Sequence, residues 1–81
     1  MIKSTKIHLI SGETNQDGYD LLATVTATLE CGAIIRGIEI IRTDEGKVKV
    51  DRETRPLFTT KELRKAFCAK LVEEYTAVAN A

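Results

Sequence analysis

Apolar and polar side chains alternate strictly from Ala23 to Leu29. Successive side chains of a strand point to opposite faces of a sheet, so the pattern predicts a strand with one buried face and one threonine-bearing face. Two more strand-like segments follow, Ala33 to Arg42 and Lys47 to Val50. Glycine-containing turns at Cys31-Gly32 and Thr43 to Gly46 separate the three, which predicts antiparallel hairpins.

The third predicted strand breaks its alternation at Gly37, because Ile35 before it and Ile38 after it cannot share one face in regular register. A β-bulge at Gly37 would restore the phase. Alternatively, Ile35 and Ile41 lie on a second apolar face that a partner covers. We therefore assign Ile35 and Ile41 to a predicted dimer or partner surface.

The N-terminal segment adds a further strand. Lys3 to Ile10 places Ile7 and Leu9 on one face, as a half-buried strand requires. Ser11 to Gly18 is dense in residues that favour turns, and we expect a mobile loop there.

A helix follows the strands and closes the pattern. Pro56 ends the sheet region because proline cannot donate to a strand ladder. Thr59 as N-cap with Glu62 three residues later predicts a capping box, and Phe58 and Leu63 can form a hydrophobic staple. An apolar stripe at helical spacing, which we expect to lie across the alanines of the second strand, comprises Leu63, Ala66, Phe67, Leu71, Tyr75 and Val78.

Size and composition place these elements in a single domain, residues 1–81. The hydrophobic share of 43% and the charged share of 30% exclude a disordered chain. We therefore predict an α+β fold, an antiparallel sheet of about four strands with one C-terminal helix packed on one face. A chain of 81 residues buries only a small core, so pairing with a second copy is a natural way to complete it, and we expect a homodimer.

Several classes of protein are disfavoured. No apolar run is long enough for a membrane span, and no apolar signal region follows Met1, so we expect a cytoplasmic protein without membrane association. Cys31 and Cys68 are predicted to be reduced thiols, and with His8 they supply too few ligands for a zinc site. No constellation of acid, base and nucleophile is visible. We expect no enzymatic activity, no cofactor, no metal and no small-molecule substrate.

The charges are balanced overall but unevenly distributed. Basic residues outnumber acidic ones, ten to six, between Gly32 and Lys70, although the net charge of the chain is +0. Phosphate groups favour both cationic side chains and the free N–H groups at a helix start. If the chain binds nucleic acid, we expect the contacts to come from Arg52, Arg55, Lys61, Arg64 and Lys65. The alternative interpretation of this cluster is a solvated charged helix face.

The order of these parts resembles the stage V sporulation protein G family of small bacterial nucleic-acid-binding regulators. The segment Leu22 to Leu29 is similar to the second strand of that family, and Ala33 to Ile41 to its apolar third strand. Pro56-Leu57 and the helix that ends in Leu71 to Tyr75 are similar to its proline-led C-terminal helix. The connector from Val50 to Pro56 is shorter than in the family and lacks its methionine–proline pair.

The resemblance implies a function that composition alone does not supply. It implies a small, dimeric, non-enzymatic regulator that binds DNA or RNA, with Arg52 and Arg55 as the closest equivalents of the basic residues of the family. The alternative is a protein-interaction module, or a phage or mobile-element protein, with the same fold and no nucleic-acid role.

Overall fold

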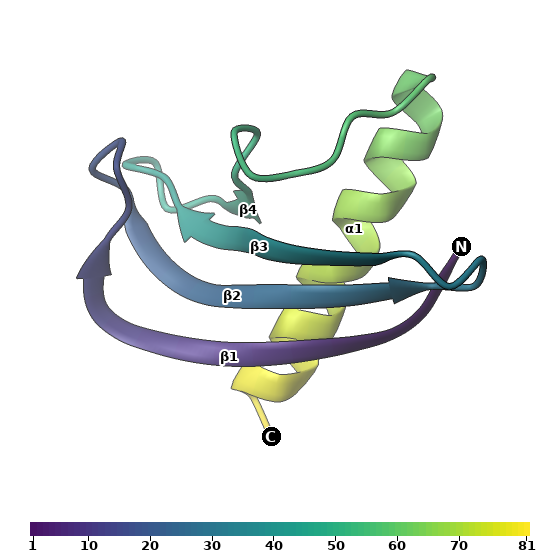
Figure 1. Cartoon of the computed structure of the whole chain (residues 1–81). Coiled ribbons are helices and arrows are strands. Elements are labelled where there is room, and N and C mark those ends of the chain that lie inside the picture. Colours follow the sequence, from purple (N-terminus) through teal and green to yellow (C-terminus); the bar gives the residue numbers. More distant parts are fainter.

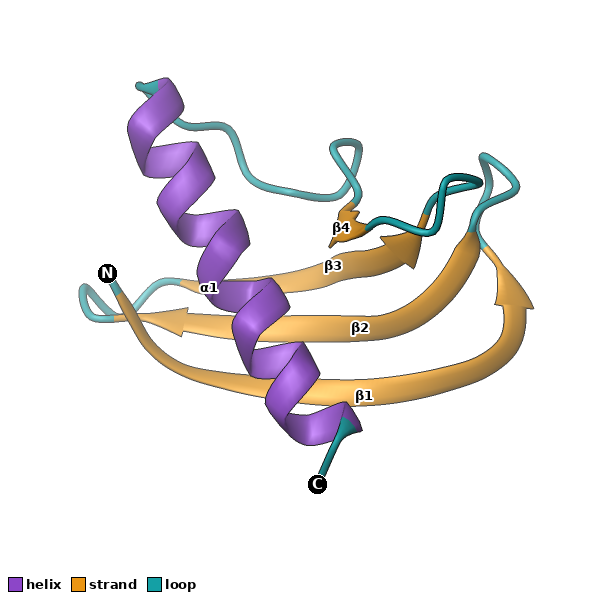
Figure 2. Cartoon of the chain, turned by 180° about the vertical axis from the view of Figure 1, so that it is seen from behind, coloured by secondary structure: helices purple, strands orange, loops and turns teal.

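The computed structural model covers residues 1–81 and contains one sheet and one helix. The strands pair antiparallel in the order β1-β2-β3-β4. The helix α1 crosses one face of this sheet and leaves the other face open (Figures 1 and 2). The predicted α+β meander with one C-terminal helix is confirmed. The elements are β1 (Ile2–Thr14), β2 (Asp20–Leu29), β3 (Ile34–Arg42), β4 (Val48–Val50) and α1 (Lys61–Ala79).

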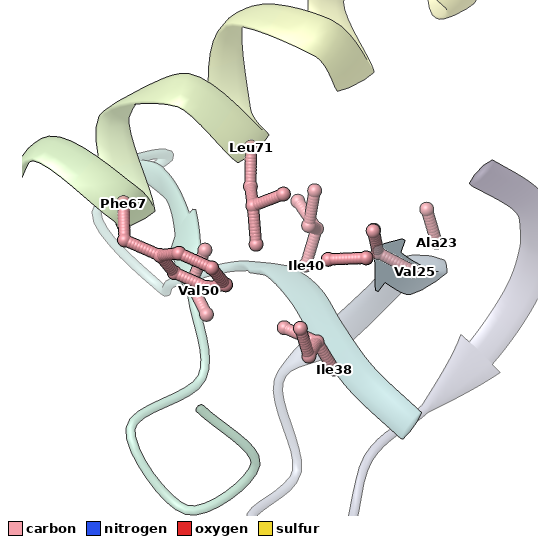
Figure 3. Packing of buried hydrophobic residues seen from close by; sticks show 8 residues of the cluster. Ala23, Val25, Ile38, Ile40, Val50, Phe67 and Leu71 are labelled. Carbon is pink, nitrogen blue, oxygen red and sulfur yellow. The ribbon is translucent and has the colours of Figure 1, made fainter. Parts of the chain in front are cut away.

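The core lies between α1 and the central strands. Ala23 and Ala27 of β2 are fully buried members of this core. Phe67 and Leu71 point from α1 into the space above the sheet (Figure 3). The other members of this cluster, Val25, Ile38, Ile40 and Val50, come from β2, β3 and β4. α1 is not apolar enough to cross a membrane.

A bulge at Gly37 corrects the phase of β3, which is the first of the two alternatives that the sequence leaves open. Val25 pairs with Ile38 and Ala27 with Ile35, so two residues of β3 oppose the single residue between Val25 and Ala27 on β2. Gly37 has a φ of 73°, which a residue without Cβ adopts without strain. The bulge brings Ile35 onto the helix side of the sheet, where it packs against the core cluster.

The predicted partner surface at Ile35 and Ile41 is therefore wrong as an exposed apolar pair. Ile35 belongs to the helix-covered face. Ile41 does lie on the opposite face, but it is only 1% exposed and sits beside Tyr19 and Lys49 of its own chain. Ile41 therefore offers almost no surface to a partner, and Ile35 is half-buried on the helix side.

β1 is longer than the sequence predicts. Lys3 to Ile10 is strand, but the ladder with β2 continues through the pairs Glu13–Leu21 and Thr14–Asp20. The pairing with β2 shifts register between Leu9 and Glu13, where β1 contains extra residues and Gly12 has a φ of 77°. The expected mobile loop at residues 11–18 is thus half strand, because cross-strand pairing outweighs the local turn preference of these residues.

The helix begins one residue later than predicted. Thr60, not Thr59, is the N-cap, and its Oγ1 accepts a hydrogen bond from the Leu63 N–H at 3.2 Å. This shift places Leu63 rather than Glu62 at the third helical position, so the predicted capping box does not form. Phe58 packs against Phe67, with ring centroids 5.1 Å apart. Of the predicted stripe, Phe67 and Leu71 are buried, whereas Leu63 and Val78 are 41% and 42% exposed.

The cap gives a direct test of this helix start. Thr60→Ala should lower the free energy of unfolding by about 1 kcal/mol, because it removes the acceptor of the Leu63 N–H. Thr59→Ala is the matched control and should change it by less than about 0.5 kcal/mol, since Thr59 lies outside the helix. Urea unfolding of both variants measures the difference. A larger loss for Thr59→Ala would contradict the observed cap.

Candidate nucleic-acid interface

The start of α1 forms a hollow with basic walls. The hollow has a volume of about 240 Å³ and lies between the segment Arg55 to Lys61 and the first turns of the helix. Arg55, Lys61 and Arg64 line it, and we call it the basic hollow. The free N–H groups and the dipole of a helix N-terminus also favour an anion at this end. The hollow therefore combines three cationic side chains with the positive end of a helix.

Arg55 is positioned by a tight turn of residues 51–55, the Asp51 turn. The Asp51 carbonyl oxygen accepts hydrogen bonds from the Thr54 N–H at 3.1 Å and from the Arg55 N–H at 3.2 Å. Thr54 Oγ1 accepts from the Glu39 N–H at 2.9 Å, which fastens the turn to the edge of β3. Pro56 then fixes the direction in which the chain leaves towards the helix. Arg55 is half-buried, so its side chain starts from an ordered backbone.

The structure brings together three of the five predicted binding residues. Arg55, Lys61 and Arg64 share the basic hollow. Arg52 instead borders a separate hollow beside Asp17 and lies 3.8 Å from the Glu53 carboxylate. Lys65 is exposed on the helix and does not line the basic hollow.

The positive charges of Arg55 and Arg64 act on the thiol of Cys68 in α1. Burial raises the pKa of the Cys68 thiol, and the positive charges of these two arginines oppose that rise. Cys68 is half-buried and packs against the core, while Cys31 is exposed in the turn between β2 and β3. Both cysteines are free thiols, and no group of three or more His, Cys, Asp or Glu side chains is placed to hold a metal ion.

A buried polar cluster behind the Asp51 turn has no counterpart in the sequence predictions. Asn15 and Asp51 are both buried, and Asn15 Nδ2 donates to Asp51 Oδ2 at 3.1 Å. Asn15 Oδ1 also accepts from the backbone N–H groups of Asp17 and Tyr19, each at 3.0 Å. The only sequence signal for this link is an asparagine that opens a turn, because its partner is 36 residues away.

Glu39 joins this cluster from the open face of the sheet. Burial is the largest cause that raises the pKa of the Glu39 carboxyl above its ordinary value of 4.5. The neighbouring Asp51 charge and the hydrogen bond with Asp51 raise it further, while a hydrogen bond with Asn15 lowers it. The ionised form of Glu39 is therefore the less favourable one in the folded protein.

Comparison of the chain with protein-family models, with curated proteins and with solved structures finds no match. The resemblance to the stage V sporulation protein G family therefore stays a prediction, carried by the residues quoted above.

The raised pKa of Glu39 predicts a pH dependence of stability with a definite sign. Because the folded-state pKa lies above the unfolded value, Glu39 contributes stability that is fully present below pH 4.5 and is lost as pH rises through the folded-state pKa. Glu39→Gln should therefore be more stable than the wild type at pH 7, and the advantage should shrink as the pH falls towards 4.5. Thermal unfolding across this pH range measures it.

Glu45→Gln, in the exposed turn before β4, is the control and should follow the wild-type profile. A Glu39→Gln profile parallel to that of the wild type would show that the burial of Glu39 has no energetic consequence.

Proposed function

We propose that this chain is a small, non-enzymatic regulatory protein of the cytoplasm that binds nucleic acid through the basic hollow. The convergence of Arg55, Lys61 and Arg64 on the N-terminal end of α1 is the observation that carries the proposal. Cationic side chains and helix N-termini are the groups that proteins use to hold phosphate oxygens. The resemblance to a family of nucleic-acid-binding regulators supports the same conclusion.

The electrostatics favour a local contact rather than a general attraction. The net charge of the chain is +0, so the whole-protein field does not draw in a polyanion. The basic hollow is lined by no carboxylate, and none of its three cations is in an ion pair. Binding through such a site depends on a few phosphate contacts and should weaken steeply with salt.

The second candidate function is a protein-interaction module. Leu57 lines the same hollow and is fully exposed, and an apolar side chain in that position is typical of a protein contact. An absence of binding to nucleic acid at low salt would favour this alternative.

The basic hollow predicts a salt-dependent affinity for a labelled single-stranded oligonucleotide, measured by fluorescence anisotropy. Arg55→Gln with Arg64→Gln should weaken binding about tenfold or more at low salt, because each hydrogen bond to a charged group contributes about 1.5 kcal/mol or more. The slope of log K against log salt concentration should fall by about 1.4, or about 0.7 for each lost phosphate contact.

Arg52→Gln with Lys65→Gln is the charge-matched control, because it removes two positive charges outside the basic hollow. This control should keep most of the affinity. Equal losses in the two double variants would attribute the effect to net charge and not to the basic hollow, and no binding by the wild type to single- or double-stranded probes would overturn the proposal.

We also propose that the protein acts as a homodimer that pairs through β1. This strand has 13 residues and forms an open edge of the sheet, whereas β4 at the other edge has three. An edge strand presents unpaired N–H and C=O groups that a second copy can complete by antiparallel pairing.

Sedimentation equilibrium tests the dimer. The mass should approach twice the 9.0 kDa of one chain as concentration rises through the micromolar range. A mass of 9.0 kDa at high micromolar concentration would refute the dimer.

A further inference from the structure

The open face of the sheet carries rows of hydroxyl and basic side chains. Ser4 pairs with Thr28 and Lys6 pairs with Thr26 across β1 and β2. These residues alternate with the buried Val25 and Ala27, so they lie on the face away from α1. Their hydroxyl and ammonium groups take no part in the side-chain hydrogen bonds of the protein. Figure 1 is viewed from this face, which no helix covers.

The bulge in β3 adds Arg36 to these rows. Ile35 and Ile38 both belong to the helix side, so Arg36 and Gly37 together oppose Thr26 on the open face. A bulge commonly re-aims a side chain in this way beside a functional site. Gly37 leaves open space next to Arg36, because a Cβ built there would meet no atom within 4 Å.

These side chains surround a second hollow, the threonine hollow, with a volume of about 340 Å³. No carboxylate lines it, and neither Lys6 nor Arg36 takes part in an ion pair. Ile34 contributes an apolar wall and is 54% exposed. The side chains of the open face that line the hollow are Ser4, Lys6, Thr26, Thr28, Ile34 and Arg36.

We propose that the threonine hollow binds the phosphodiester backbone of a single nucleic-acid strand, as a second contact surface in addition to the basic hollow. The proposal rests on the proposed function. Lys6 and Arg36 supply uncompensated positive charge, and the hydroxyl groups of Thr26 and Thr28 donate to phosphate oxygens. The exposed side chain of Ile34 offers an apolar surface to a sugar or base.

The charge distribution on the open face sets the path of the strand. Glu39 pairs with Thr24 further along the same face, and its carboxyl lies beside that of Asp51. A polyanion that followed the strands of the sheet would meet these carboxylates. The nucleic acid therefore crosses β1, β2 and β3 at the end that holds Lys6 and Arg36. β1 and β3 lie about 10 Å apart with β2 between them. The long side chains of Lys6 on β1 and Arg36 on β3 can therefore hold one phosphate or two neighbouring ones.

The test is anisotropy with a fluorescein-labelled single-stranded DNA of about twelve nucleotides, within the usual site size for such contacts. Lys6→Gln with Arg36→Gln should weaken binding several-fold and lower the slope of log K against log salt concentration by about 1.4. Lys47→Gln with Lys70→Gln is the matched control, because it removes the same charge at positions outside both hollows. The methyl NMR signals of Ile34, Thr26 and Thr28 should shift when the wild type binds.

The outcomes separate this proposal from the basic hollow. If Arg55→Gln with Arg64→Gln weakens binding and Lys6→Gln with Arg36→Gln does not, the threonine hollow is overturned and the basic hollow stands. If only the second pair weakens binding, the threonine hollow stands and the basic hollow is overturned. If the Lys47 and Lys70 control loses as much affinity, net charge explains the effect and the threonine hollow is overturned. No binding by the wild type overturns both sites.

Discussion

The hydrogen bonds of Asp51 hold the Asn15 turn, the edge of β3 and the connector to α1 together. The Asp51 N–H donates to the Glu39 carbonyl at 2.8 Å, so the residue continues the edge of β3 where β4 stops. Its buried carboxylate accepts from Asn15 Nδ2 and from the Glu53 N–H, and a buried charge without such partners would be costly. One residue thus joins three segments that are distant in sequence. The orientation of Arg55 and the approach to α1 follow from it.

The Gly37 bulge determines which side chains of β3 face α1 and which face solvent. The Gly37 bulge keeps Ile35 and Ile38 on the helix side, where the core needs apolar side chains. It also leaves Arg36 on the open face next to Thr26. A regular strand would place one of the two isoleucines in water and would move Arg36 relative to β2. Packing and surface chemistry are therefore coupled through a single glycine.

Local patterns in the sequence were sufficient for the elements and for their order. The alternation in β2, the phase break at Gly37 and the glycine turn at Cys31-Gly32 each predict what the structure shows, because they reflect backbone geometry over a few residues. Local preference failed where tertiary pairing decides. Residues 11–14 favour a turn but extend β1, and Thr59 fits a capping box although Thr60 caps the helix. The Asn15–Asp51 bond spans 36 residues and has no periodic signature.

The candidate site was predictable as a set of charges but not as a surface. The five basic residues are close in sequence, yet the Asp51 turn directs Arg52 away from Arg55. We propose that Arg55, Lys61 and Arg64 form one phosphate-binding surface at the start of α1. Amide chemical-shift mapping with a single-stranded oligonucleotide tests this assignment. The largest shifts should cluster at residues 55–64, and shifts confined to the C-terminal half of α1, or no shifts at low salt, would contradict it.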